Sequence, residues 1–202
     1  MSEAARPPLV LASTSRFRQQ LLARLDLPFE GVAHRFDERA ADHLFGQLSP
    51  AEFALHLARG KAQSLAPSHP DQFILAADQL AVLDEPEGPE LLHKPGTHAR
   101  AVEQLMRLRG RSHRLVSGVV LRAPDGQERS VIDEQRLTMR AFERAEAEDY
   151  VARYEPLDSC GSYHIEDAGI RLFERIRSED YTGIIGLPLL AVCQLLREAD
   201  LL

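Results

Sequence analysis

The chain has 202 residues, enough for a single domain over residues 1–202 with a substantial buried core. Its apolar and charged fractions, 44% and 27%, are ordinary for a soluble globular protein. A formal net charge of −7 argues against a surface for nucleic-acid polymers, although it leaves room for a local basic pocket. No stretch approaches membrane-spanning length and no signal peptide opens the chain, so we expect a cytoplasmic protein that does not contact the membrane.

Short apolar runs, helical periodicities and turn signals alternate along the chain. Ser49-Pro50-Ala51-Glu52 has the hydroxyl cap, the proline and the third-position glutamate that open a helix. Pro124-Asp125-Gly126 between two apolar runs predicts a hairpin, and Glu85–Glu90 is expected to be a surface loop. The expected elements, in chain order, are a strand at 9–12, a helix with apolar positions from 17 to 25, an extended piece at 28–31, a helix at 50–65, a strand at 73–83, a helix from 98 to 108, hairpin strands at 115–121 and 131–142, a short acidic helix at 146–154 and a last helix from 188 to 196. This order predicts a mixed α/β fold.

The turn between the first strand and the first helix is a candidate phosphate site. It carries Ser13, Thr14, Ser15 and Arg18, and such a turn points backbone N–H groups and the positive end of a helix outward. Serine and threonine are also common helix caps, so a purely structural role explains the same residues. The glycine-rich phosphate motifs GxxxxGKS, GxxxxGKT and GxGxxG are absent, and the pattern alone leaves both interpretations open.

Two charged residues interrupt apolar patterns. Lys61 shares one helix face with three apolar residues, because residues four apart lie on the same side of a helix. Its side chain then either extends to water or reaches an anion in a cleft. Asp78 follows the apolar run at 73–77, where a buried carboxylate is costly unless it is paired or bound to a metal. At the carboxyl end of a strand it would face a ligand crevice, and a structural helix-capping role is the alternative.

Other polar residues give weaker signals. Asp37-Glu38 is an acidic pair in a polar loop, and most such pairs are simply solvated. Lys94 precedes a proline in a loop between a strand and a helix. The basic run Arg107–Arg114 is expected to be a solvated loop. The histidines show no HxxxH or HExxH spacing, which disfavours a zinc site.

Together these segments resemble the Maf family of nucleotide pyrophosphatases, nearly end to end, from about Leu9 to Leu196. The shared stretches read LASTSRFRQQLL, FDE, ARGKAQ, AADQLAVLD, HKP, LRGRSHRLVSGV and GIIGLPLLAVCQLLR. The resemblance implies a mixed β-sheet flanked by helices, with two lobes around a cleft, as in the inosine-triphosphate pyrophosphatases. It also implies hydrolysis of a nucleoside triphosphate between the α and β phosphates with a divalent metal, Mg²⁺ or Mn²⁺, and it leaves a homodimer open.

The family's functional positions fall on the residues singled out above. The resemblance assigns substrate binding to Ser13, Arg18, Lys61 and Lys94, and metal binding to Glu38 and Asp78. Asp78 is also our expected general base, which would accept a proton from the attacking water. The sequence departs from the common family pattern at Arg16, Phe17 and His93, which leaves the main site intact and bears on substrate choice.

Four features favour the subgroup that hydrolyses 7-methyl-GTP over the subgroup that prefers dTTP and UTP. Gln79 stands where the second subgroup has threonine, Phe17 replaces an arginine, and the segments Cys160–Tyr163 and Leu172–Arg175 differ from a Gly-Gly-Tyr pattern. The positive charge of 7-methylguanine suits aromatic faces and carboxylates, and Phe17 is a candidate for such a face. We expect Glu166 or Gln79 to accept hydrogen bonds from the guanine edge. A dTTP/UTP or inosine-triphosphate pyrophosphatase, and a non-catalytic nucleotide-binding regulator of septum formation, are the alternatives.

Overall fold

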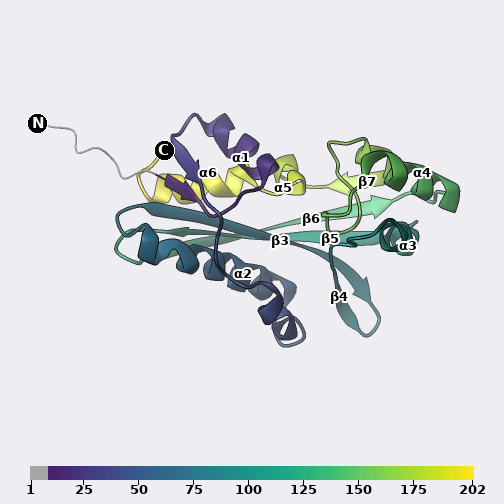
Figure 1. Ribbon diagram of the computed structural model, residues 1–202, viewed down its shortest axis with the longest axis horizontal. Helices are drawn as coiled ribbons and strands as arrows, with labels where there is room; N and C mark the ends of the chain where they lie inside the picture. The colour runs from purple at the N-terminus through teal and green to yellow at the C-terminus, as the bar shows by residue number, and fades with distance from the viewer. Residues whose placement is uncertain (1–8) are drawn as a thin grey trace, which may run out of the picture. The chain divides into compact units, whose positions relative to one another are not determined.

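The computed structural model, drawn in Figure 1, describes residues 9–202. These residues divide into two compact units. The first unit contains residues 9–79, Ser117–Asp133 and Gly186–Leu202, and the second contains Leu80–Val116 and Glu134–Ile185. Among the described residues, no helix is both long and apolar enough to cross a membrane.

The strands form one mixed sheet, as predicted. Their order is β2-β1-β3-β5-β6-β7, and β4 pairs with β3. β1 is parallel to β2 and to β3, whereas β4 is antiparallel to β3 and β7 is antiparallel to β6. The strands are β1 Leu9–Leu11, β2 Phe29–Gly31, β3 Phe73–Glu85, β4 Gly88–Leu92, β5 Ser112–Arg122, β6 Glu128–Met139 and β7 Phe173–Arg177.

Helices cover both faces of the strands in the first unit. Figure 1 shows α2 (Pro50–Leu65) on one face, with α1 (Arg16–Leu22) and α6 (Leu189–Glu198) on the other. Short 3-10 helices lie at Ala23–Leu25, Arg39–Leu44 and Ala66–Ser68. The predicted capping box of α2 is present, because Ser49 and Glu52 each accept a hydrogen bond from the other's backbone N–H. The apolar stripe of α2 then packs on the even-numbered residues of β1 and β3.

Two more helices pack together in the second unit. They are α3 (His98–Leu108), which Thr97 caps, and α4 (Arg144–Tyr154). A 3-10 helix at Gly169–Leu172 and the short helix α5 (Tyr181–Ile185) complete this unit. Its core joins the inner faces of α3 and α4 to β3, β5 and β6, with residues such as Leu83, Leu105, Leu115, Leu137 and Val151.

Two of the local predictions are wrong. The segment Glu85–Glu90 is mostly strand, because β3 continues to Glu85, β4 begins at Gly88, and their backbones pair across a tight turn. The basic run Arg107–Arg114 is the end of α3, a turn and the start of β5 instead of a solvated loop. Its arginines are not merely solvated, since the β3–β4 hairpin places acidic side chains beside them: Arg107 and Arg111 both pair with Glu85.

A buried histidine lies in the core of the second unit. His113 is 1% exposed, and its Nε2 lies 2.8 Å from the Tyr163 hydroxyl oxygen. The rings of Tyr163 and Phe173 lie against it. Burial lowers the pKa of His113 to about 4, because the folded protein gives the imidazolium little solvation. His113 is therefore neutral in the folded protein at neutral pH.

Acid should destabilise the protein through this residue. The unfolded chain binds the proton near pH 6.5 and the folded chain only near pH 4, so stability is lost as the pH falls through this window. Between pH 7 and 4.5, the wild type should lose about 2 to 3 kcal/mol more unfolding free energy than His113→Gln. Denaturant titrations at both pH values measure this difference, with the exposed His93→Gln as the control that keeps wild-type behaviour. An equal pH dependence in His113→Gln and wild type would contradict the assignment.

Candidate functional site

Asp78 and Lys61 form a buried ion pair in the first unit. Asp78 lies within β3 instead of at its end, and it projects with Ile74 and Ala76 toward α2, because alternate strand residues share a face. The Lys61 Nζ on α2 donates to Asp78 Oδ1 at 2.5 Å. Their side chains are only 4% and 7% exposed. Lys61 therefore pairs with a buried carboxylate of the same chain instead of extending to water, and its contact with a substrate anion stays a prediction.

Glu38 extends this ion pair toward solvent. Its Oε2 lies 3.2 Å from Lys61 Nζ, and its Oε1 lies 3.3 Å from His34 Nε2. The Glu38 side chain is 43% exposed, so the cluster is buried at Asp78 and accessible at Glu38. Burial, helped by the Lys61 charge, lowers the pKa of His34, which is therefore neutral at pH 7. The cluster thus combines one positive and two negative charges.

A close contact between a loop and a helix brings Glu38 to Lys61. A Cβ atom at Gly60 of α2 would lie 2.5 Å from the Phe36 ring, so Phe36 packs directly on the helix backbone. Asp37 accepts the backbone N–H groups of Arg39 and of the residue after it, which fixes the start of the 3-10 helix. The two neighbouring acidic residues therefore have different contacts: Asp37 caps a turn, and Glu38 contacts Lys61 of the ion pair.

The turn after β1 is a helix cap. The Ser15 hydroxyl accepts the backbone N–H of Arg18 and caps α1. Ser13 is buried, and its hydroxyl accepts the backbone N–H of Ser15 at 3.1 Å. The capping interpretation of this turn is confirmed, and substrate binding by Ser13 stays a prediction.

Arg18 joins three segments of the first unit. Its Nε donates to the Gly186 carbonyl and its Nη1 donates to the Ala77 carbonyl, both at 2.9 Å. Gly186 has a φ of 126°, a conformation that favours glycine and that sets the direction of this carbonyl. Since Ala77 directly precedes Asp78, Arg18 anchors the backbone beside the buried carboxylate. A guanidinium has five N–H donors, so further donors can still serve an anion.

Gln79 faces away from Asp78. Consecutive residues of a strand point to opposite faces, and Gln79 Nε2 donates to the Ser117 hydroxyl at 3.2 Å. The two neighbours in the sequence therefore lie in different environments. Contact of Gln79 with a nucleobase stays a prediction.

The sequence matches the Maf-like protein family over residues 8–199. The chain belongs to the Maf family. Similar proteins include a "7-methyl-GTP pyrophosphatase" of Chromohalobacter salexigens, 40% identical over 195 residues, which are 96% of each chain. Proteins of the same name from Xanthomonas campestris pv. campestris (strain 8004) and Pseudomonas putida are each 40% identical, covering 96% of both chains in the first case and 94% and 95% in the second.

The remaining predicted Maf site residues, Lys94 and Glu166, belong to the second unit. Lys94 is exposed in the loop between β4 and α3. Glu166 lies at the surface before the last 3-10 helix, and partial loss of solvation raises the pKa of its carboxyl group. The structure describes each within its own unit, and their roles in substrate binding stay predictions.

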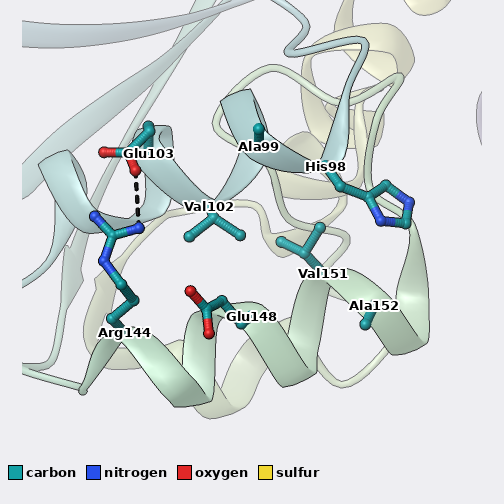
Figure 2. Close-up of a pocket in the computed structure, with 8 residues that line it drawn as sticks. All are labelled: His98, Ala99, Val102, Glu103, Arg144, Glu148, Val151 and Ala152. Carbon is teal, nitrogen blue, oxygen red and sulfur yellow. Dashed lines mark hydrogen bonds and ion pairs between the residues drawn. The ribbon is translucent and has the colours of Figure 1, made fainter.

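The second unit also has a surface pocket between α3 and α4, with a volume of about 360 Å³. Figure 2 shows Val102 and Val151 toward its middle, and the ion pair of Glu103 and Arg144 at one end. Neither Lys94 nor Glu166 lines it. The pocket therefore adds nothing to the predicted nucleotide site.

Sequence reasoning missed three residues that shape the cluster of Lys61, Asp78 and Glu38. His34 contacts Glu38, and the contact of Phe36 with Gly60 brings the Glu38 loop onto α2. His34 precedes Glu38 by four residues, but outside a helix this spacing gives no reason to expect a contact. Gly60 directly precedes Lys61 in the sequence, but only the fold explains why this position needs a glycine, because the Phe36 ring occupies the space of a Cβ atom.

Arg18 should be irreplaceable by lysine. A lysine carries its charge on one atom and cannot donate to two carbonyls in the fixed directions of a guanidinium. We expect Arg18→Lys to lower the unfolding free energy by about 1 to 3 kcal/mol, because a buried acceptor loses its donor. Arg16→Lys is the matched control, since Arg16 is an exposed arginine on the same helix. Equal stabilities of the two variants in denaturant titrations would contradict this role.

Proposed function

We propose that this Maf protein hydrolyses 7-methyl-GTP to 7-methyl-GMP and pyrophosphate in the cytoplasm. The observation that carries the proposed chemistry is the buried pair of Lys61 and Asp78 with Glu38 at its solvent side. The similarity to proteins named 7-methyl-GTP pyrophosphatase over nearly the full chain supports the choice of substrate.

The carboxylates of Glu38 and Asp78 fit a divalent cation that binds together with the nucleotide. Both offer oxygen ligands, and the cluster has one more negative than positive charge. Within residues 9–202 no group of three or more His, Cys, Asp or Glu side chains could hold a metal alone. Mg²⁺ commonly uses one or two carboxylates and completes its shell with water and substrate phosphates. When bound, Mg²⁺ or Mn²⁺ would neutralise phosphate charge.

Lysine is used selectively in this chain. Of the 24 Lys and Arg residues, only Lys61 and Lys94 are lysines. An ammonium is a compact point charge on a flexible stem that can follow a phosphate oxygen, whereas a guanidinium prefers fixed bidentate geometry. We assign Lys61, Lys94 and Arg18 to the phosphates, where they offset the charge that builds up on the leaving pyrophosphate.

The reaction itself is an attack of water on the α-phosphorus. The new bond joins the water oxygen to this phosphorus, the bond to the bridging oxygen of the β-phosphate breaks, and pyrophosphate leaves. Asp78 accepts the proton of the attacking water as general base. The Lys61 contact compensates for the burial of the Asp78 charge, which would otherwise be costly.

In this proposal the protein recognises the base by the positive charge on the 7-methylguanine ring. The Arg16 guanidinium lies 5.0 Å from the centroid of the Phe17 ring, so this ring already accepts a cation on one face. A 7-methylguanine ring carries a positive charge and would suit Phe17 in the same way. Gln79 and Glu166 are our proposed partners for the guanine edge. A homodimer also stays a prediction.

The substrate assignment predicts the order of specificity constants. kcat/KM for 7-methyl-GTP should exceed the values for GTP, dTTP, UTP and inosine triphosphate, because only the methylated base adds a ring cation. Side-by-side assays of pyrophosphate release with Mg²⁺ and with Mn²⁺ decide the order. A clear preference for dTTP or UTP would place the protein in the other subgroup, and inosine triphosphate as the best substrate would make it a housekeeping purine enzyme. No turnover of any triphosphate would favour the regulator.

Asp78→Asn should lower kcat about a hundredfold or more, the usual scale of general-base catalysis, because the amide keeps the shape and removes the basic oxygen. Lys61 keeps Glu38 as a partner, so the variant should fold, as circular dichroism can verify. Asp71→Asn, at an exposed turn before β3, is the control that should retain activity. Near-normal turnover in folded Asp78→Asn would rule out Asp78 as the base.

A further inference from the structure

We propose that Lys61 and the divalent cation compete for the same two carboxylates, so that Lys61 holds the metal position in the empty enzyme and leaves it when metal and nucleotide bind. This inference rests on the proposed function only in taking Glu38 and Asp78 as metal ligands. It concerns an equilibrium between side chains and does not depend on which base the enzyme prefers.

The geometry places one cation between two carboxylates. The Lys61 Nζ lies 2.5 Å from Asp78 Oδ1 and 3.2 Å from Glu38 Oε2. Both carboxylates therefore already have a cation within contact distance. In the part of the chain that the structure describes, no third acidic or histidine side chain completes a metal-binding group with them. A metal ion that enters must take its protein oxygens from the lysine.

The charges show why replacement of the Lys61 ammonium by a divalent cation depends on the phosphates of the nucleotide. With Lys61 in place, its ammonium lies between the two carboxylates of Glu38 and Asp78, so these three side chains have a single excess negative charge. Displacing the ammonium would leave it buried near a divalent cation without an anion, which is costly. A triphosphate supplies that anion and also supplies oxygen ligands for the metal. Metal binding without nucleotide should therefore be weak, and Lys61 is what makes it weak.

Removal of the ammonium should strengthen metal binding. Lys61→Met keeps an unbranched side chain that ends one atom before the lysine nitrogen, and it leaves both carboxylates without their cation. Free Mn²⁺, measured by electron paramagnetic resonance in a titration of the full chain without nucleotide, should report at least about tenfold tighter binding than in wild type, a gain of about 1.4 kcal/mol. Lys61→Arg keeps the charge and should bind Mn²⁺ no more tightly than wild type.

The double variant Glu38→Gln with Lys61→Met tests whether the tighter Mn²⁺ binding of Lys61→Met occurs at these carboxylates. It should lose the extra affinity, because the metal then has only one of its two carboxylates. Binding of Mn²⁺ by Lys61→Met that is no tighter than in wild type would overturn the proposal. A gain that persists in the double variant would also overturn it, since the metal would then bind elsewhere.

A measurement on the wild type does not depend on the folding of any Lys61 variant. Because the chain has only two lysines, a protein labelled with ¹³C-lysine has two side-chain Cε resonances, which Lys94→Arg assigns. Saturating Mg²⁺ should shift the Lys61 resonance and leave that of Lys94 in place. An unchanged Lys61 resonance under saturating Mg²⁺ would contradict the competition. A preference for dTTP in the substrate assays would contradict the proposed substrate without changing the expected shift of the Lys61 resonance. Failure of the proposed function and failure of the competition can therefore be distinguished.

Discussion

The ion pair between Lys61 and Asp78 is the constraint on which the rest of the first unit depends. Two opposite charges that are almost completely buried must stay within contact, because separation would leave an unpaired charge in a dry environment at a cost of about 3 to 5 kcal/mol. The pair therefore fixes the position of α2 along β3. The small residues around it serve the same end, since Ala58, Ala62 and Ala76 let the helix lie close to the strand.

Close packing explains why the acidic loop can join this pair. Gly60 accepts the Phe36 ring against the helix backbone, and Gly118 of β5 packs in the same way on the far end of α2, where a Cβ would lie 2.6 Å from the Ala54 backbone. Both glycines are required by contact with neighbouring atoms and not by a special backbone angle. The result is a carboxylate cluster whose inner member is dry and whose outer member, Glu38, meets solvent.

Much of this fold could be predicted from local signals, and the failures share a cause. The capping box of α2, the Thr97 cap and the Pro124–Gly126 turn each act over a few residues, so the sequence contains all that is needed. β4 and β7 were not predicted, because Gly88–Leu92 and Phe173–Arg177 are strands only through pairing with β3 and β6. Such pairing is a tertiary property that outweighs the turn and charge signals of the segments themselves.

The site shows the same limit. Lys61 and Asp78 stood out because each charge interrupts an apolar pattern, yet their pairing at 2.5 Å follows only from the packing of α2 on β3. The anchoring of Arg18 on two carbonyls, and the opposite directions of Asp78 and Gln79, likewise needed the fold.

The claim that water attacks the α-phosphorus beside Asp78 is tested most directly by hydrolysis of 7-methyl-GTP in H₂¹⁸O, with mass spectrometry of both products. The account predicts one ¹⁸O atom in 7-methyl-GMP and none in pyrophosphate. Label in the pyrophosphate, or release of inorganic phosphate with a nucleoside diphosphate, would contradict it.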